Sequence, residues 1–222
     1  MSNDNKKSRD DWYSNTAWSK EIEEEFFVRY KRARPYNRFQ YLRFQAQTLF
    51  TQNDDALSDV ALKLLDRFFQ DYTAEGKFDK TGALLLTAEI YDRKKVFNKA
   101  LEYYAKAADN EEAFPTVDWG AKKAFARFVV VHGIKELFNK AEARVRDEDD
   151  DFRFPKEKYQ KNSLLAIFEK KKGDIQKALH YKKLADEAAV TTHSGYAYHK
   201  NMGLVQDRDG ELDKLLNEIE NH

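Results

Sequence analysis

Residues 83–108 read ALLLTAEIYDRKKVFNKALEYYAKAA, and this stretch decides the fold that the sequence predicts. Apolar and small residues recur every three or four positions on both sides of a polar centre, which aligns them on helix faces. The polar run 92–95 interrupts that pattern, so we expect two antiparallel helices joined by a tight turn. Ala88 and Ala100 leave room for the helix axes to approach closely. Because such a pair has apolar surface on more than one side, it needs neighbours on both sides, as in a helical-repeat array.

The alanine positions recur along the chain. Ala61 and Ala100 are 39 residues apart, and Ala178 follows Ala100 at twice that interval. This spacing predicts an intermediate unit centred near residue 139, and it predicts that each alanine lies where two helices touch.

The repeated segments carry a resemblance to the tetratricopeptide repeat. That family places a small residue and an aromatic in its first helix, and an alanine, an aromatic and an alanine in its second. The matching residues here are Ala88, Tyr91, Ala100, Tyr104 and Ala107. The family's early tryptophan is replaced by Leu84, and its closing proline is displaced to Pro115.

A second, weaker match covers residues 163–189. It has Ala166, a turn at Gly173-Asp174, Ala178 and Ala185, but Glu169 and Lys182 stand where the family has aromatics. Most of the chain also resembles a group of uncharacterised bacterial repeat proteins, with Trp12, Trp18, the segment 38–49, Tyr198-His199 and the segment 203–205 in common. The resemblance implies the same fold and supplies no activity that can be carried over to this chain.

We therefore predict an all-α protein, an α-solenoid of about five antiparallel helix pairs wound as a right-handed superhelix. Low counts of Gly (8) and Pro (3) favour long helices over a turn-rich β fold. We expect residues 1–11 to be disordered and residues 12–222 to form a single helical-repeat domain. About eleven helices are expected, and the last pair covers residues 196–205 and 211–219.

Composition limits the functional classes. Lys+Arg and Asp+Glu both number 39, so no net charge draws the chain to nucleic acid or to a membrane. The chain has no cysteine, a polar start and no apolar run of about 20 residues. We therefore expect a cytoplasmic protein that does not enter membranes.

No motif for catalysis, metal binding or cofactor binding stands out. The acidic run 146–151 lacks the alternating ligands and glycine of a calcium loop, and the five histidines have no zinc-binding setting. We predict that the protein is not an enzyme and that it needs neither cofactor nor metal.

The predicted function is a non-catalytic scaffold that binds a protein or peptide on its concave face. In a superhelix of this kind the first helix of each pair lines that face, here residues 36–50, 80–92, 118–132 and 156–171. The non-core candidates on those helices are Gln45, Glu89, Arg93, Lys122, Arg127, Lys161 and Lys170. They grow more basic toward one end, so we expect an acidic or amphipathic partner segment whose acidic end lies toward Lys161 and Lys170. The Lys/Asn cluster that some relatives use for a terminal carboxylate is not matched, because Leu85, Glu89 and Ile167 occupy such positions.

An alternative function is binding of RNA or another polyanion by residues 29–43, RYKRARPYNRFQYLR, which combine six basic residues with interleaved aromatics. The basic candidates are Arg29, Arg32, Arg34, Arg38 and Arg43. In the competing interpretation the aromatics belong to the core, and the basic residues serve the helix end and pair with carboxylates. We favour that interpretation because a nucleic-acid-binding domain is usually basic overall.

Overall fold

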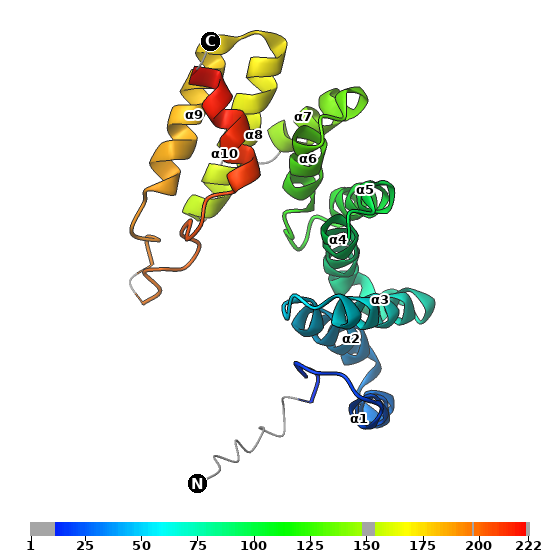
Figure 1. Ribbon diagram of the computed structural model, residues 1–222. Helices are drawn as coiled ribbons and strands as arrows, with labels where there is room; N and C mark the ends of the chain where they lie inside the picture. The colour runs from blue at the N-terminus through cyan, green and yellow to red at the C-terminus, as the bar shows by residue number, and fades with distance from the viewer. Residues whose placement is uncertain (1–11, 148–153, 197, 221–222) are drawn as a thin grey trace. The chain divides into compact units, whose positions relative to one another are not determined.

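The computed structural model describes residues 12–147, 154–196 and 198–220. In that part of the chain every regular element is helical, which confirms the all-α prediction (Figure 1). The expected disorder of residues 1–11 and most of the acidic run 146–151 lie outside the described residues. The chain divides into two compact units, Met1–Ala121 and Lys122–His222, which are described separately below. No described helix is long and apolar enough to cross a bilayer.

Unit 1 contains five α-helices in its described part: α1 (Lys20–Arg32), α2 (Pro35–Phe50), α3 (Asp55–Gln70), α4 (Lys77–Arg93) and α5 (Phe97–Ala113), with a 3-10 turn at Ala74–Gly76. The hydroxyl of Ser19 accepts a hydrogen bond from the Ile22 N–H and so caps α1, as its position before the first turn predicts. Pro35 opens α2 at a position where its missing N–H costs no helix hydrogen bond.

The helices pack in consecutive pairs, α2 with α3 and α4 with α5. Eight consecutive residues of α4, from 81 to 88, are buried, so this helix has protein on every side along that stretch. From these small and apolar residues we predicted that the central helix pair, α4 and α5, needs neighbouring helices on both sides. Because α4 is enclosed in this way, few of its side chains remain available at the surface.

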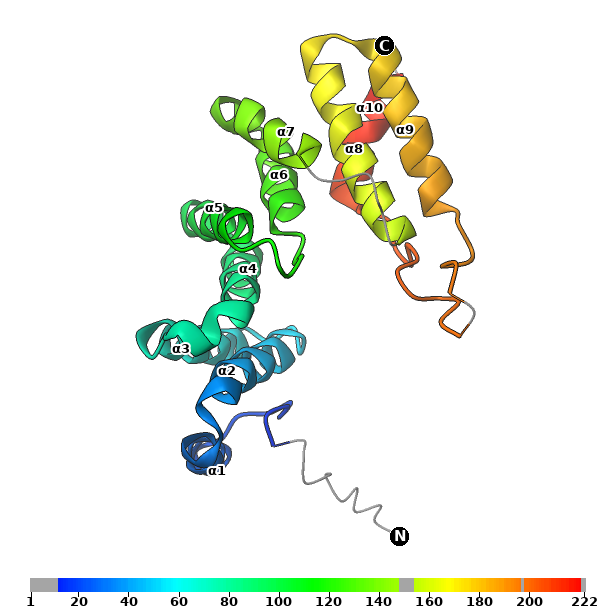
Figure 2. The same cartoon turned by 180° about the vertical axis from the view of Figure 1, so that it is seen from behind.

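Unit 2 contains the rest of α6 (Ala121–Val131), a 3-10 turn at Lys135–Leu137, and then α7 (Phe138–Arg146), α8 (Pro155–Lys172), α9 (Ile175–Ala189) and α10 (Gly210–Glu220). α8 and α9 form its main pair, and α10 packs on both of them. The three helices lie side by side in the front view and in the view from behind (Figure 2).

Ala61, Ala100 and Ala178 are all fully buried, and each lies on the second helix of its pair, α3, α5 and α9. The repeated spacing therefore marks equivalent packing positions. The intermediate position is shifted, because residue 139 is exposed and the buried alanine of α7 is Ala141. Residues 135–137, directly before α7, form a 3-10 turn.

The predicted helix at residues 196–205 is wrong, and the described part of the chain has ten α-helices. The described residues of this segment form a loop whose glycines 195 and 203 have positive φ angles, which interrupt helical geometry. The Gly203 carbonyl accepts a hydrogen bond of 2.8 Å from the Lys156 N–H, a donor in the first turn of α8 that lacks a helical partner. The loop thus serves as a cap for α8.

Candidate protein-binding surface

The side chain of Gln45 is not available to a partner. Its exposed fraction is 0%, and it is paired with Asn15 through hydrogen bonds of 2.9 Å from the Asn15 N–H and 2.7 Å to the Asn15 carbonyl. This residue must be removed from the predicted concave-face set. Its role is to hold the aromatic N-terminal segment against α2, since a buried amide needs hydrogen-bond partners.

Arg93 also has an internal role. Its guanidinium donates to the Phe50 carbonyl at 2.9 Å, to Asn53 at 2.8 Å and to the Ser58 hydroxyl, and it stacks on the Phe50 ring. It thereby ties the end of α4 to the turn between α2 and α3. Its remaining freedom to contact a partner is small.

Glu89 is the exposed member of the set in unit 1. Although its side chain reaches solvent, surrounding protein raises the pKa of the carboxyl, and the nearby charge of Asp92 raises it further. The ionised carboxylate is therefore less favourable here than in a freely exposed glutamate.

In unit 2, two cations of the predicted concave-face set, Arg127 and Lys170, contact the chain's own C-terminal segment, which includes α10. Arg127 pairs with Asp209 and with Glu211, the latter at 2.7 Å. The Lys170 ammonium donates to the Glu218 carbonyl at 2.9 Å and lies 3.2 Å from its carboxylate. Lys161 is buried and Lys122 is half-buried.

The basic segment 29–43 follows the interpretation favoured from sequence. Arg38 donates to the carbonyls of Ala33 and Lys31 at the end of α1, and Arg43 is buried in an ion pair of 2.8 Å with Asp79. Arg29 pairs with Glu25 one turn away, while Arg34 donates to the Tyr36 hydroxyl. Arg32 is exposed, and Tyr30 and Phe39 belong to the core. The structure therefore does not assemble these cations into one open surface.

A different feature of unit 1 is a row of accessible aromatic side chains, which we call the aromatic surface. Tyr13 stacks on Tyr41 and on Phe44, with ring centroids 4.6 Å and 6.1 Å apart. The Arg43 guanidinium lies over both the Phe44 ring and the Trp119 ring, at 4.5 Å and 4.7 Å, so it links two aromatic groups. The aromatic surface consists of Tyr13, Tyr41, Phe44, Phe78, Phe114 and Trp119.

A pocket of about 140 Å³ forms one end of the aromatic surface. Phe78 and Phe114 line it and are 52% and 53% exposed, and Trp119 forms another wall. Thr81 and Lys77 add a polar edge. Half-exposed aromatics around a small pocket are typical of protein-binding surfaces, because they offer large apolar area with little loss of side-chain freedom.

Local sequence places Trp119 at this pocket. Gly82 in α4 leaves space for the indole, since a Cβ on residue 82 would lie 2.8 Å from the Trp119 ring. The Glu111 carboxylate accepts hydrogen bonds from the Trp119 N–H at 2.7 Å and from the Ala121 N–H at 3.2 Å. Glu111, a residue of α5, thus fixes the position of the backbone that carries the Trp119 indole.

The site residues predicted from sequence did not include Phe78, Phe114 and Trp119. All three lie near helix ends: Phe78 precedes the predicted start of its helix, Phe114 precedes Pro115, and Trp119 precedes Gly120. A signal did exist for Phe114 and Trp119, because an aromatic beside a proline or glycine at a helix boundary is not needed for the helix stripe. Their convergence depends on the packing of α4 and α5, which periodicity does not predict.

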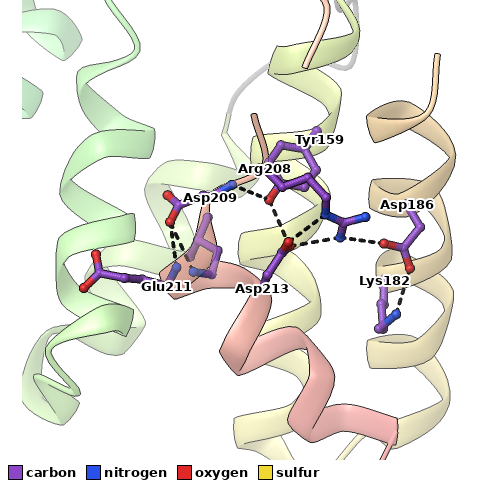
Figure 3. Close-up of polar contacts among 8 residues, drawn as sticks. Tyr159, Lys182, Asp186, Arg208, Asp209, Glu211 and Asp213 are labelled. Carbon is purple, nitrogen blue, oxygen red and sulfur yellow. Dashed lines mark hydrogen bonds and ion pairs between the residues drawn. The ribbon is translucent and has the colours of Figure 1, made fainter. Parts of the chain in front are cut away.

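The polar contacts around α10 form the second notable site (Figure 3). The Tyr159 hydroxyl donates to Asp213 at 3.1 Å and accepts from the Asp209 N–H at 3.1 Å. Arg208 bridges Asp213 and Asp186 with bonds of 2.7 Å. Residues of α8, α9 and α10 thus meet in one connected network.

The charges in this network shift one another's proton affinities. Burial alone would raise the pKa of Asp209, but hydrogen bonding and attraction from Arg127 outweigh it and hold the pKa below its usual range. The pKa of Asp186 is likewise lowered, because Lys182 and Arg208 outweigh its burial. Both carboxyls are therefore ionised at neutral pH.

No group of His, Cys, Asp and Glu side chains suited to a metal ion occurs among the described residues. Comparisons of the chain with protein-family models, curated proteins and solved structures found no match.

Proposed function

We propose that the protein is a non-catalytic scaffold that binds a segment of another protein through the aromatic surface of unit 1. The observation that supports this most is the pair of half-exposed aromatics, Phe78 and Phe114, beside a small pocket walled by Trp119. A contiguous patch of exposed apolar side chains on a protein surface often marks an interaction site. This proposal keeps the scaffold role predicted from sequence and moves the binding surface.

We further propose that the helix pairs belong to a tetratricopeptide-repeat-like array with right-handed superhelical winding. The equivalent burial of Ala61, Ala100 and Ala178 on second helices supports a repeat. The cytoplasmic location expected from the sequence stays a prediction.

The test compares three versions of the full chain as baits in affinity capture from the native cell, with quantification by mass spectrometry. The first is unaltered, the second carries Phe78→Ser and Phe114→Ser, and the third carries Phe97→Ser. Phe97 is 44% exposed and lies on the second helix α5 outside the pocket lining, so it is a matched control.

We expect one or more proteins to be captured by the unaltered chain and by the Phe97→Ser chain, and to be lost from the double variant. Circular dichroism should show equal helix content in all three chains, because the changed side chains are half-exposed. An identical set of captured proteins for all three baits would refute the aromatic surface as the binding site.

A further inference from the structure

The surface beneath α10 is lined by cations from three helices of unit 2. Arg127 comes from α6, Lys170 from α8 and Lys182 from α9. We call these three residues the basic face. Each pairs with a carboxylate of the C-terminal segment: Arg127 with Asp209 and Glu211, Lys170 with Glu218, and Lys182 with Glu220 at 2.8 Å. A row of cations on separate helices thus matches a row of acids on one segment.

α10 has the pattern of an amphipathic helix that docks on such a face. Its buried residues are Leu212, Leu216 and Ile219, at spacings of four and three. Its acids flank that apolar stripe and reach outward to the basic face. Recognition of this kind, with apolar anchors at helical spacing and charges on the rim, is a common way for a helix to bind a groove.

Besides its ion pairs with the basic face, α10 has polar contacts to Tyr159 and Arg208 through Asp213. It has 11 residues, which is shorter than a helix that is stable alone in water, so its helicity depends on docking. Three apolar side chains anchor it, and residues 190–209, which precede it, contain no helix or strand in their described part. Elements with few buried contacts open before the core does.

We propose that the basic face is a docking surface for an acidic amphipathic helix of a partner protein, and that α10 is the occupant within the chain that the partner displaces. The partner helix carries apolar residues at positions equivalent to 212, 216 and 219. It carries acids at positions equivalent to 209, 218 and 220. This inference adds a second surface and does not depend on the aromatic surface of unit 1.

A partner helix must compete with α10 for the basic face, and α10 has an advantage because it is covalently attached to the chain. A tethered segment acts at an effective concentration of the order of millimolar, so a free helix of equal affinity displaces little of it. A partner must bind more tightly than α10 or meet a chain in which α10 is weakened. The basic face is therefore closed by default.

The first measurement is hydrogen exchange of the unaltered full chain. We expect amides of residues 213–220 to exchange at least tenfold faster than the slowest amides of α8 and α9. Equal protection in all three helices would overturn the proposal, because α10 would then open only with the core.

The second measurement uses the full chain with Leu216→Asp, which removes the central anchor of α10 and leaves the basic face unchanged. A fluorescent peptide of residues 207–220 should bind this variant at least tenfold more tightly than it binds the unaltered chain. A control peptide with Asp209→Asn, Glu218→Gln and Glu220→Gln should bind at least tenfold more weakly than the unchanged peptide. Raising the salt concentration should weaken binding of the unchanged peptide and reduce the difference in affinity between the two peptides.

Two results of the peptide experiment would overturn the proposal. One is equal binding of the two peptides or no binding by a variant whose α8 and α9 stay protected. The other is loss of protection in α8 and α9 of the variant, which would make α10 part of their core. Neither result bears on capture through Phe78 and Phe114, so failure of this inference is distinguishable from failure of the proposed function.

Discussion

Small buried residues set the distances between helices, and Ala100 is the clearest example. It is fully buried on α5, and the same position recurs as Ala61 and Ala178. Ala100→Glu places an unpaired charge between helices, so we expect a loss of about 3–5 kcal/mol in the free energy of unfolding. Asn98→Glu, on an exposed position of the same helix, should change it by less than about 0.5 kcal/mol. Urea denaturation of both variants measures the difference, and a stable Ala100→Glu protein would contradict the packing described here.

Glu89 gives a prediction about pH. Its pKa is raised in the folded protein, chiefly because surrounding protein reduces the hydration of the carboxylate, so the ionised form destabilises the fold. This penalty is absent below the pKa of the unfolded chain, about 4, it grows as pH rises from that value toward the folded pKa, and it is complete above the folded pKa. Glu89→Gln should therefore raise the melting temperature at pH 7, and the gain should disappear below about pH 4. If Glu89→Gln raises the melting temperature equally at pH 7 and below pH 4, the charge of Glu89 is not the cause of the increase.

At the residue scale, sequence predicted buried alanines well and surface residues poorly. Small residues at helical spacing have one common use, which is close helix approach. A Gln or Arg on a helix has several uses, and Gln45 and Arg93 were assigned to a partner although they bind their own chain. Which use applies depends on neighbours such as Asn15 and Asn53, which lie 30 and 40 residues away.

Among the elements, the loop before α10 tests how irregular structure supports a helix. Gly203 has a φ of 66°, and a Cβ at this position would overlap the Phe154 ring. Gly203→Ala should lower the free energy of unfolding by more than about 1 kcal/mol and loosen the cap on α8. Gly210→Ala is the control, because nothing lies within 4 Å of a Cβ there and alanine favours a helix. Thermal melts of both variants measure the difference, and Gly210→Ala should be neutral or stabilising. A larger loss of stability in Gly210→Ala than in Gly203→Ala would contradict this loop geometry.

The elements themselves were largely predictable. The apolar stripes, the Ser19 cap and the turn glycine Gly173 place most helices within a few residues of their observed ends. The predicted helix at 196–205 failed because aromatic and apolar residues there suggested a stripe. Its glycines instead adopt left-handed backbone conformations, and Tyr198 points to solvent. Positive φ at a glycine depends on long-range contacts, here with Phe154, that a local pattern does not contain.

For the whole molecule, the two compact units predict that damage stays local. In an array, stability arises mainly from contacts between neighbouring repeats. The change Ala100→Glu in unit 1 should therefore reduce amide protection in α2 to α5 more than in α8 and α9, as hydrogen exchange with mass spectrometry would measure. Equal loss of protection in both units would contradict this expectation.

The all-α fold class was accessible from sequence because it depends on the helical spacing of apolar residues, which recurs in many segments of the chain. The candidate surfaces were less accessible, since each gathers residues from several elements. Phe78, Phe114 and Trp119 come from three segments, and the basic face takes one cation from each of three helices. We predicted an acidic or amphipathic partner segment near Lys170, and in the structure Lys170 pairs with Glu218 of the chain's own α10.

The central claim is that the aromatic surface binds a protein, and the most direct test is the affinity of a captured partner for the full chain. Isothermal titration should compare the unaltered chain, the Phe78→Ser and Phe114→Ser double variant, and Phe97→Ser in one buffer. We predict that the double variant binds about 30-fold or more weakly, which corresponds to about 2 kcal/mol, while Phe97→Ser stays within about threefold. Equal affinities for the unaltered chain and the double variant, with equal helix content, would contradict the account.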